Sequence, residues 1–561
     1  MFRFPLTGFL INTLLLCVLG IPRIFREGKW LYEEDRGRDH RFYIKGIAYQ
    51  RQGHGKASPN VAFNEAQIFH DPLADPDACR RDLPHFSSAS INTLRVYHIN
   101  SSLNHDECME MFSEANIYVI LDLSIPRTGS IVDGTTPWST SIMDMYFSTI
   151  DAFEKYDNIL AYNVGDSTVD YKNYTTFEAV PYLKAAVWDI KTHLRAINST
   201  KLVGYAAKAI NFTNFRVPGV YEFLTHTAPD RQRDLADYLS CGDEPNAIDL
   251  YGLNDYSWCP MYGNTMTKSR YEEIFAQFSS YNRPIYFSEF GCVYDGDRRY
   301  PRVWDEVDAL FTNMTLIMSG GIAFSYFPTL VDQLEYGMVN VTEDGTAINV
   351  SAEFLALGER YSANNGPDTP SPSNIGSDDP VQCNATSGLY VNSDLETLPD
   401  TPNAEHCDCL QNALSCQVSP AVAEEIETVA PLITTVCRQL LGSGGDCSSI
   451  FGNRTSGEYG RVVGCSPGTR LSYAMSQLYE LREKDPTFCD FEGNAGVNIG
   501  ALSAGTAEES LRSCFGLQGL SNSSAGPPGP VDETSDTSFN VLLTWPSKLS
   551  LLGGLIVMGG L

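Results

Sequence analysis

One acidic residue, Glu289, directly follows an apolar segment of the chain. It lies in Tyr286-Phe-Ser-Glu-Phe-Gly-Cys292, where a run typical of a buried strand ends in a carboxylate. A carboxylate in such a place costs free energy unless it is paired or used in chemistry. Glu289 is therefore either a catalytic group or half of a structural ion pair with an arginine such as Arg95. The residues alone leave both interpretations open.

Two other apolar segments also end in polar or aromatic residues. One finishes with Arg95 and Tyr97, and another runs into Asn254–Trp258. Barrel enzymes carry their catalytic groups at the C-terminal ends of parallel strands. These ends are therefore the candidate site, and the strands that carry them must form one sheet.

From about Phe42 to Phe327, short apolar stretches alternate with longer amphipathic ones. Repeated strand–helix alternation predicts a parallel sheet with helical crossovers. Seven or eight such units in roughly 300 residues fit a closed (β/α)₈ TIM barrel of the α/β class. A doubly wound open sheet is the alternative, but no glycine-rich nucleotide loop follows the first strand. The expected strands are Tyr43–Ile47, Asn92–Tyr97, Tyr118–Leu123, Ile159–Val164, Ala247–Leu253, Ile285–Ser288 and Gly321–Phe327, and examples of helices are Asp106–Ala115, Ile142–Lys155 and Tyr182–Arg195.

The cysteines indicate an exported protein with a second, smaller domain. Of the fifteen cysteines, Cys17 lies in the N-terminal apolar run, which leaves an even number. Eight of them fall between Cys407 and Cys514, as expected for a small domain held by disulfides. Sequons at exposed asparagines would accept glycans. They occur at Asn173, Asn198, Asn313, Asn340 and Asn453.

Both ends of the chain resemble processing signals. Arg3 and the short apolar run Leu10–Leu19 predict a secretory signal peptide. The apolar tail Leu549–Leu561 follows a polar stretch of small residues, which predicts replacement by a GPI anchor. The expected organisation is a signal peptide at 1–20, the barrel at 21–362, a linker at 363–406, the cysteine-rich domain at 407–516, a Ser/Pro/Gly linker at 517–538 and the anchor signal at 539–561.

The net charge of −30 argues against a nucleic-acid partner, because phosphates require a basic surface. It suits a neutral ligand rich in hydroxyl groups. No Cys-x-x-Cys pair occurs, which disfavours a zinc ribbon. We expect no metal and no cofactor.

Motifs along nearly the whole barrel resemble the fungal cell-wall β-1,3-glucanosyltransferases of glycoside hydrolase family 72, in the branch with an X8 domain. The matching stretches are Tyr43–Gln50, Asp71–Cys79, Arg95–Tyr97, Asn104–Cys108, Ile117–Leu123, Asp151–Asp157, Tyr251–Asn254, Trp258-Cys259 and the Glu289 motif, and in the small domain Cys407–Leu410, Leu471–Ala474 and Cys489–Phe491. The resemblance implies a TIM barrel followed by a mainly helical X8 domain.

The same resemblance implies a retaining mechanism that needs two carboxyl groups, a nucleophile and an acid/base. It places Glu289 at the nucleophile position. The acid/base glutamate of the family belongs to a Gly-Asn-Glu motif, and the matching stretch here is Gly165-Asp-Ser167. Ser167 thus takes the place of the acid/base, and Asp166 takes that of the asparagine. Asp166 is a possible substitute carboxyl, and its charge should raise a pKa at the site by repelling Glu289.

The sugar-binding positions of the family are better kept. They fall on Gln50, Tyr97, Asp122, Tyr256 and Trp258, with Phe324 and Tyr326 where the family has two tyrosines on the last strand. The acceptor-side loop differs, because Ala206–Asp230 is an insertion and the aligned arginine position falls at about Gln232, between Arg231 and Arg233. Aromatic rings and planar polar groups suit a glucan chain.

By resemblance we also expect seven disulfides. They are Cys79–Cys108, Cys241–Cys383, Cys259–Cys292, Cys407–Cys465, Cys409–Cys514, Cys416–Cys489 and Cys437–Cys447. Two functions are implied: a monomeric GPI-anchored enzyme that cleaves and religates β-1,3-glucan at the outer leaflet of the plasma membrane and the cell wall, impaired by Ser167, or an inactive glucan-binding wall protein derived from it. A third and weaker hypothesis is an adhesin-like surface protein without glucan affinity.

Overall fold

The structure is a computed structural model of the whole chain. It describes residues 20–34, 39–51, 70–125, 130–131, 137–171, 173–210, 231–259, 265–293, 301–331, 334–342, 345–375, 383, 391–392, 394–423, 425–501 and 505–516. The predicted signal peptide and anchor signal, the sequence before Gly20 and after Gly516, lie outside the described residues.

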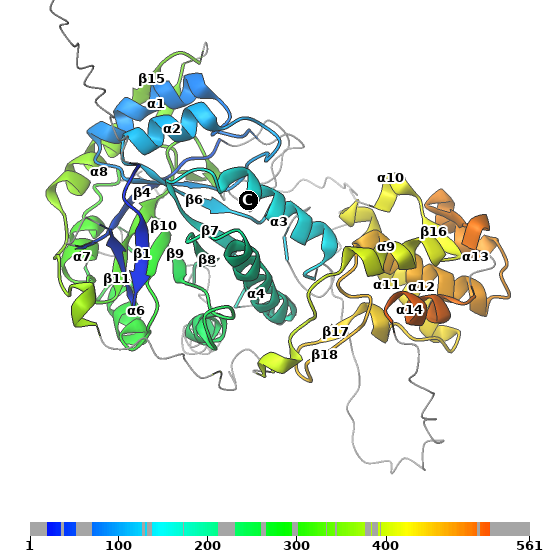
Figure 1. The fold of residues 1–561 in the computed structure, drawn as a ribbon. Helices are drawn as coiled ribbons and strands as arrows, with labels where there is room; N and C mark the ends of the chain where they lie inside the picture. The colour runs from blue at the N-terminus through cyan, green and yellow to red at the C-terminus, as the bar shows by residue number, and fades with distance from the viewer. Residues whose placement is uncertain are drawn as a thin grey trace, which may run out of the picture. The chain divides into compact units, whose positions relative to one another are not determined.

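Eight parallel strands form a closed barrel, as the sequence predicts (Figure 1). Each strand pairs with its neighbour in sequence, and β11 pairs with β4 to close the ring. Closure brings the C-terminal ends of all eight strands to one face of the barrel. The strands are β4 Ile44–Ala48, β5 Thr93–Val96, β6 Tyr118–Asp122, β7 Ile159–Asp166, β8 Leu202–Ala207, β9 Leu250–Asp255, β10 Ile285–Phe290 and β11 Met318–Ala323.

Seven of these strands overlap the predicted ones, whereas β8 was not predicted. Its last residues, Ala206 and Ala207, fall inside the segment that the sequence analysis assigned to an insertion. Alanine and glycine have weak strand propensity. Pairing of β8 with β7 on one side and β9 on the other extends the chain there regardless. The last predicted strand also differs, since β11 ends at Ala323 rather than at Phe327.

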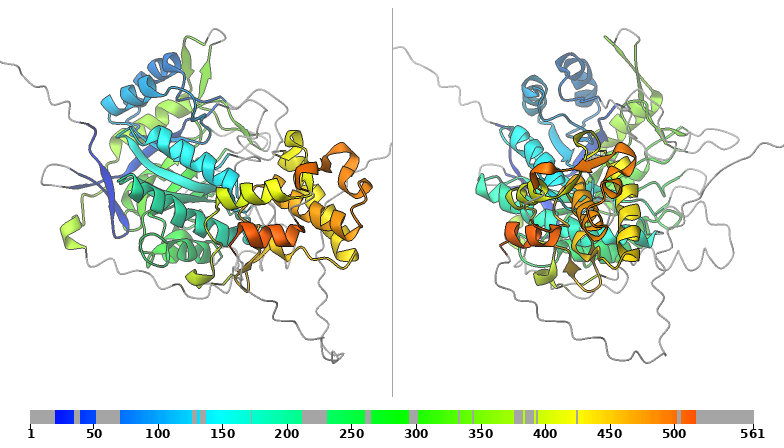
Figure 2. Two further views of the ribbon diagram at one scale, coloured as in Figure 1. Left: turned by 45° about the vertical axis from the view of Figure 1, so that its right-hand side comes forward. Right: turned by 90° about the vertical axis from the view of Figure 1, so that its right-hand side faces the viewer.

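Helices surround the barrel, and the long helices α3 and α4 lie side by side outside it (Figure 2). The three predicted helices agree with α2, α3 and α4 to within about two residues, the usual uncertainty of helix ends. The helices are α1 Pro76–Ser88, α2 Asp106–Glu114, α3 Thr140–Phe153, α4 Val180–Ala196, a helix over 231–240, α6 Tyr271–Phe278, α7 Glu306–Thr312 and α8 Ala352–Ala363.

Apolar side chains fill the barrel interior in layers. Ile44, Ile120, Leu160 and Ile322 are buried there together with Leu31 of an N-terminal hairpin. That hairpin consists of β1 Ile24–Glu27 and β2 Trp30–Glu33, and β3 His40–Arg41 extends it to a three-stranded antiparallel sheet. The sheet covers the N-terminal end of the barrel interior. The face that carries the C-terminal strand ends is thereby left for chemistry.

The start of the predicted linker packs on this closed end. Tyr32 donates a hydrogen bond to the carbonyl of Pro370, and Tyr43 donates one to the carbonyl of Pro367. The backbone N–H of Arg41 donates to Asp368. Residues 364–375 are poor in apolar side chains, and polar contacts hold them instead.

The small domain has its own core of buried apolar residues and half-cystines, in which α11 packs against α12. It is mainly helical, as expected. Its elements are α9 Ala404–Ala413, β16 Cys416–Val418, α10 Pro420–Ala423, α11 Ile426–Gly442, β17 Gly452–Asn453, β18 Glu458–Tyr459, α12 Pro467–Leu481, α13 Thr487–Asp490, β19 Ala495–Val497 and α14 Ala507–Cys514.

The structure contains seven disulfides that join the same cysteines as the expected pairs. Four of them lie within the small domain. A domain of this size gains stability from such cross-links because they restrict its unfolded chain.

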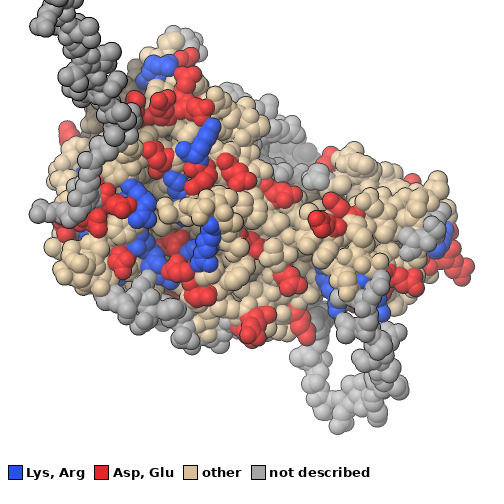
Figure 3. All heavy atoms as spheres, viewed as in Figure 1, with Lys and Arg blue, Asp and Glu red and all other residues tan. Residues whose placement is uncertain are grey.

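Two surface properties bear on the partners. Acidic side chains are spread over the face drawn in Figure 3, with lysines and arginines interleaved among them. Among the helices that the structure describes, none has the length and apolar character needed to span a bilayer.

Candidate functional site

Glu289 lies in β10, and both oxygens of its carboxylate are bound. Tyr97 donates a hydrogen bond of 2.8 Å to Oε1, and Tyr256 donates one of 2.7 Å to Oε2. Arg95 approaches Oε1 at 3.3 Å, so the ion pair considered from the sequence is present. The side chain keeps about 10% of its surface exposed. A carboxylate so oriented can serve as a nucleophile while it also belongs to a structural network.

The turn after Glu289 requires glycine. Gly291 has φ +119°, and a Cβ at this position would lie 2.5 Å from the ring of Trp304. Glycine alone adopts this conformation without strain. The Glu-Phe-Gly sequence thus lets the chain turn sharply after Glu289. The Trp304 ring occupies the space where a side chain at 291 would lie.

Arg95 of β5 is the centre of the site. Its guanidinium is completely buried and contacts Asp122 at 2.7 Å, Asp166 at 3.1 Å and Glu289 at 3.3 Å. The guanidinium carbon also lies 4.3 Å from the centre of the Tyr97 ring. One cation therefore holds three carboxylates from three different strands, β6, β7 and β10.

Burial, more than the excess of negative charge, shifts the pKa values of the acids of the site. Burial raises the pKa of Glu289 to about 7, and the charge of Asp166 adds to the shift, whereas Arg95 and the two tyrosines oppose it. Burial likewise raises the pKa of Asp122 to about 6 against the effect of Arg95. Repulsion between Asp166 and Glu289 was expected from the sequence, and the shared guanidinium explains why the two charges are held so near each other.

Asp166 is the last residue of β7 and Ser167 follows it, where the strand becomes irregular. The pairing with β8 shifts register between Asn163 and Asp166, and Ser167 has φ +53°, in the left-handed region. Both side chains approach Asn254 of β9, whose Nδ2 lies 3.3 Å from Asp166 Oδ1 and from Ser167 Oγ. Ser167 also donates a 3.0 Å hydrogen bond to Asp166. The Ser167 hydroxyl and the partly exposed Asp166 carboxylate are therefore bound to each other.

Asp122 and Gln50 lie in the same site, but their polar atoms bind other groups of the protein. Asp122 accepts hydrogen bonds from Arg95 and from Asn163, the latter at 2.7 Å. Gln50 is completely buried and bonds to the backbone of His70, Tyr97 and His98. Tyr97 and Tyr256 instead direct their hydroxyls to Glu289.

Phe324 lies beside Tyr256, and their rings meet edge-on at 6.1 Å. Phe324 therefore belongs to the aromatic wall around Glu289. The Trp258 ring instead packs against Tyr271, with ring centres 4.8 Å apart, and its Nε1 donates to Asp305.

Tyr326 is completely buried and packs against Tyr49, Phe86 and Phe354. This surrounding is that of a core residue, and the role of Tyr326 as a sugar contact stays a prediction. The aromatic side chain that does join Tyr256 and Phe324 is Tyr336, at ring distances of 5.6 and 5.4 Å.

Sequence reasoning did not single out Tyr336 or Asn163. Tyr336 follows the two-residue strands β12 Leu330–Val331 and β13 Leu334–Glu335, which precede a second hairpin of β14 Val339–Val341 and β15 Ile348–Val350. Its position in a loop after the last barrel strand carries no motif. Asn163 carried a signal, because it is a buried polar residue inside an apolar strand.

The described contacts of the acceptor-side residues are with groups other than Glu289. Gln232 is buried beside Arg270, Arg231 donates to the carbonyl of Tyr171, and Arg233 pairs with Asp237. Most of the predicted insertion, residues 211–230, lies outside the described residues. Within the described part of the chain, no three His, Cys, Asp or Glu side chains form a group that could hold a metal ion.

Comparisons with known proteins agree with this geometry. The sequence profile of a family described as glucanosyltransferase matches residues 22–365, and that of the X8 domain matches residues 414–496. The chain is 32% identical to the 1,3-beta-glucanosyltransferase gas1 of Schizosaccharomyces pombe over 503 residues, which cover 88% of this chain and 82% of that protein.

Solved structures of Saccharomyces cerevisiae Gas2p have the same fold. A ligand-free glutamate-to-glutamine mutant superposes with a TM-score of 0.72 at 31% identity, covering 89% of this chain and 96% of that one. The same mutant in complex with laminaritetraose and laminaripentaose gives a TM-score of 0.69 at 30% identity, covering 89% and 99%.

Proposed function

Because the chain belongs to the glucanosyltransferase family, glycoside hydrolase family 72, in the branch with an X8 domain, we propose that it is a GPI-anchored cell-surface protein that binds β-1,3-glucan at the Glu289 face of the barrel. We further propose that its ability to cleave and religate glucan is strongly reduced. The family relationship supports the ligand and the place in cell-wall assembly, and the residues at the end of β7 support the reduction.

The observation that carries the proposal is Ser167. By resemblance it stands where the family has its acid/base glutamate, and a serine hydroxyl is too weak an acid to protonate a leaving sugar oxygen. Loss of a positioned general acid lowers the rate by roughly 10²–10⁴-fold. In free energy this is about 3–5 kcal/mol of transition-state stabilisation.

Asp166 is a candidate replacement for the missing acid. It keeps 22% of its side-chain surface exposed, so a ligand could reach it. Its Oδ2 is paired with Arg95, however, and its Oδ1 is bound to Ser167 and Asn254. Both carboxylate oxygens of Asp166 are therefore already engaged by neighbouring side chains of the protein.

The aromatic and polar residues around Glu289 support the proposal that the protein binds glucan. Glu289, Tyr97 and Tyr256 are oriented by mutual hydrogen bonds, and Phe324 and Tyr336 extend the aromatic wall. Aromatic faces beside polar groups suit the C–H faces and hydroxyl rims of a sugar chain. The relative Gas2p has been solved with laminari-oligosaccharides.

Two assays on the purified protein test the proposal. Calorimetry with laminari-oligosaccharides should detect binding at millimolar concentration or better. Incubation with a reduced laminari-oligosaccharide should give longer and shorter products very slowly or not at all. Absence of binding would refute the glucan site, and brisk elongation would refute the reduced activity.

An active transferase that uses Asp166 is the second candidate, favoured by the exposure of that side chain. It predicts that Asp166→Asn abolishes transfer. If transfer is strongly reduced because of Ser167, Asp166→Asn should leave the slow transfer rate of the natural chain unchanged.

A further inference from the structure

Gln50 lies beside the site, yet its polar atoms are used by the backbone. Its Oε1 accepts the N–H of Tyr97 at 3.3 Å and that of His98 at 2.9 Å, while Nε2 donates to the carbonyl of His70 at 2.7 Å. An amide oxygen has two lone pairs and the amide nitrogen two hydrogens. Both acceptor positions are therefore filled and one donor remains, in a side chain with no exposed surface.

Asp71, the residue after His70, makes a second bridge between the same two loops. Its Oδ1 accepts the N–H of Leu73 at 2.9 Å, and its Oδ2 accepts the N–H of Asn100 at 2.7 Å. The same Oδ2 lies 2.9 Å from Nε2 of His105. Its side chain is only 3% exposed, so water does not compete for these bonds. The segments after β4 and β5 are thus joined at two points, by Gln50 at Tyr97 and His98 and by Asp71 at Asn100.

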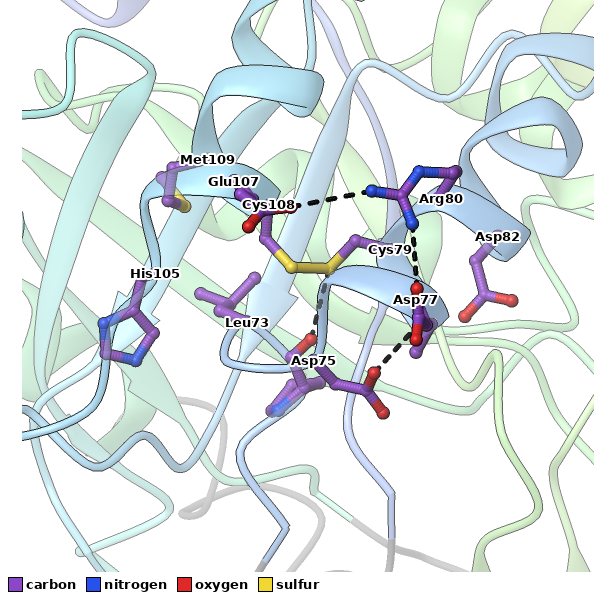
Figure 4. Close-up of a disulfide and its surroundings, with 12 residues drawn as sticks. Leu73, Asp75, Asp77, Cys79, Arg80, Asp82, His105, Glu107, Cys108 and Met109 are labelled. Atoms are coloured by element: carbon purple, nitrogen blue, oxygen red, sulfur yellow. Dashed lines mark hydrogen bonds and ion pairs between the residues drawn. A yellow bond between two sulfur atoms is a disulfide. The ribbon is translucent and has the colours of Figure 1, made fainter. Parts of the chain in front are cut away.

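The helices that follow these loops are cross-linked as well. The Cys79–Cys108 disulfide joins α1 to α2, with Leu73 and His105 beside it (Figure 4). His105 precedes the first residue of α2, and its ring packs against Phe153 of α3. The bridges made by Gln50 and Asp71 therefore connect the 97–100 segment, at its start and at its end, to a cross-linked part of the barrel.

We infer that Gln50 and Asp71 are positioning residues that hold Tyr97 in place for its hydrogen bond to Glu289. Three backbone N–H groups of the 97–100 segment, at Tyr97, His98 and Asn100, are bound by just these two side chains. The phenol of Tyr97 can remain 2.8 Å from Glu289 because its backbone is fixed in this way. Errors of about 1 Å in the placement of such a group lower rates substantially.

The inference concerns the same site as the proposed glucan binding, but its test uses no sugar. Tyr97 stabilises the charged form of Glu289, so losing this hydrogen bond should raise the titration midpoint of the carboxyl group. Gln50→Met fills nearly the same volume and removes all three hydrogen bonds. We expect it to raise the midpoint by about one unit, the worth of one hydrogen bond to a charged group.

The midpoint is read from the carboxyl ¹³C resonance of the ligand-free full chain, assigned by its absence in Glu289→Gln. The Tyr97→Phe variant should show the same rise, and adding Gln50→Met to it should cause no further change. Gln411→Met, which removes a partly buried glutamine in the small domain, should leave the midpoint unaltered.

A folded Gln50→Met protein with an unshifted midpoint would overturn the inference, because a glutamine that only contacts sugar cannot influence the empty site. A further rise in the double variant would overturn it too. If Gln50→Met does not fold, Asp71→Asn keeps the size of the Asp71 side chain and should shift the Glu289 midpoint in the same direction. An unshifted midpoint in Asp71→Asn would also overturn the inference.

Discussion

Replacing Asp166 by asparagine removes one of the three carboxylates on Arg95 without changing the size of the side chain. The two ends of one guanidinium hold Asp166 and Glu289. Two charges roughly 6 Å apart at an effective dielectric constant of about 20 repel each other by about 3 kcal/mol. This equals about 2 pKa units.

The observed shift should be smaller than this limit, since Asp166 is 22% exposed and the guanidinium lies between the two charges. We expect Asp166→Asn to lower the titration midpoint of Glu289 by about one unit. The pKa of Glu289 should fall because a nearby negative charge favours the neutral form of Glu289, and removal of that charge favours the charged form.

The assay is an NMR pH titration of the Glu289 carboxyl group between pH 4 and 9 in natural and variant protein. Asp170→Asn is the matched control, because Asp170 follows the same strand but pairs with Lys208. It should leave the midpoint in place. An unchanged or higher midpoint in Asp166→Asn would show that the charge of Asp166 does not act on Glu289, and the account of the site would fail.

Three further predictions follow from the same structure. Arg95→Met leaves three buried carboxylates without their cation and should lower the free energy of unfolding by about 3–5 kcal/mol, as urea denaturation would measure. Gly291→Ala combines an unfavourable φ with a clash and should destabilise the protein by more than about 2 kcal/mol, whereas Gly345→Ala has open space around it and should cost about 1–2 kcal/mol. Peptide mapping without reduction should recover Cys241 joined to Cys383, and a free Cys383 would disprove this link.

The barrel could be predicted from the sequence because its strands are short apolar runs between amphipathic stretches. Tyr118–Asp122 and Ile285–Phe290 are buried along their whole length, and most of their residues are apolar. The strand Leu202–Ala207 lacks this signal, since half of it is alanine and glycine. Its extended conformation depends on neighbours that the local sequence does not contain.

The site could be predicted in part. Glu289 was visible as a carboxylate directly after an apolar strand, and Arg95 as its possible partner. The sequence could not show that Arg95 also holds Asp122 and Asp166, because these contacts join strands that are distant along the chain. For the same reason the sequence could not show that Tyr326 packs against Tyr49, Phe86 and Phe354.

The most direct test of the central claim compares transfer rates of the natural chain and the double variant Ser167→Glu, Asp166→Asn on a reduced laminari-oligosaccharide. Glutamate at 167 supplies the missing acid, and asparagine at 166 removes the competing charge beside Glu289. The account predicts that the double variant elongates at least about 10²-fold faster, and that adding Glu289→Gln abolishes the gain. Brisk elongation by the natural chain that disappears in Asp166→Asn would contradict it and make Asp166 the catalytic acid.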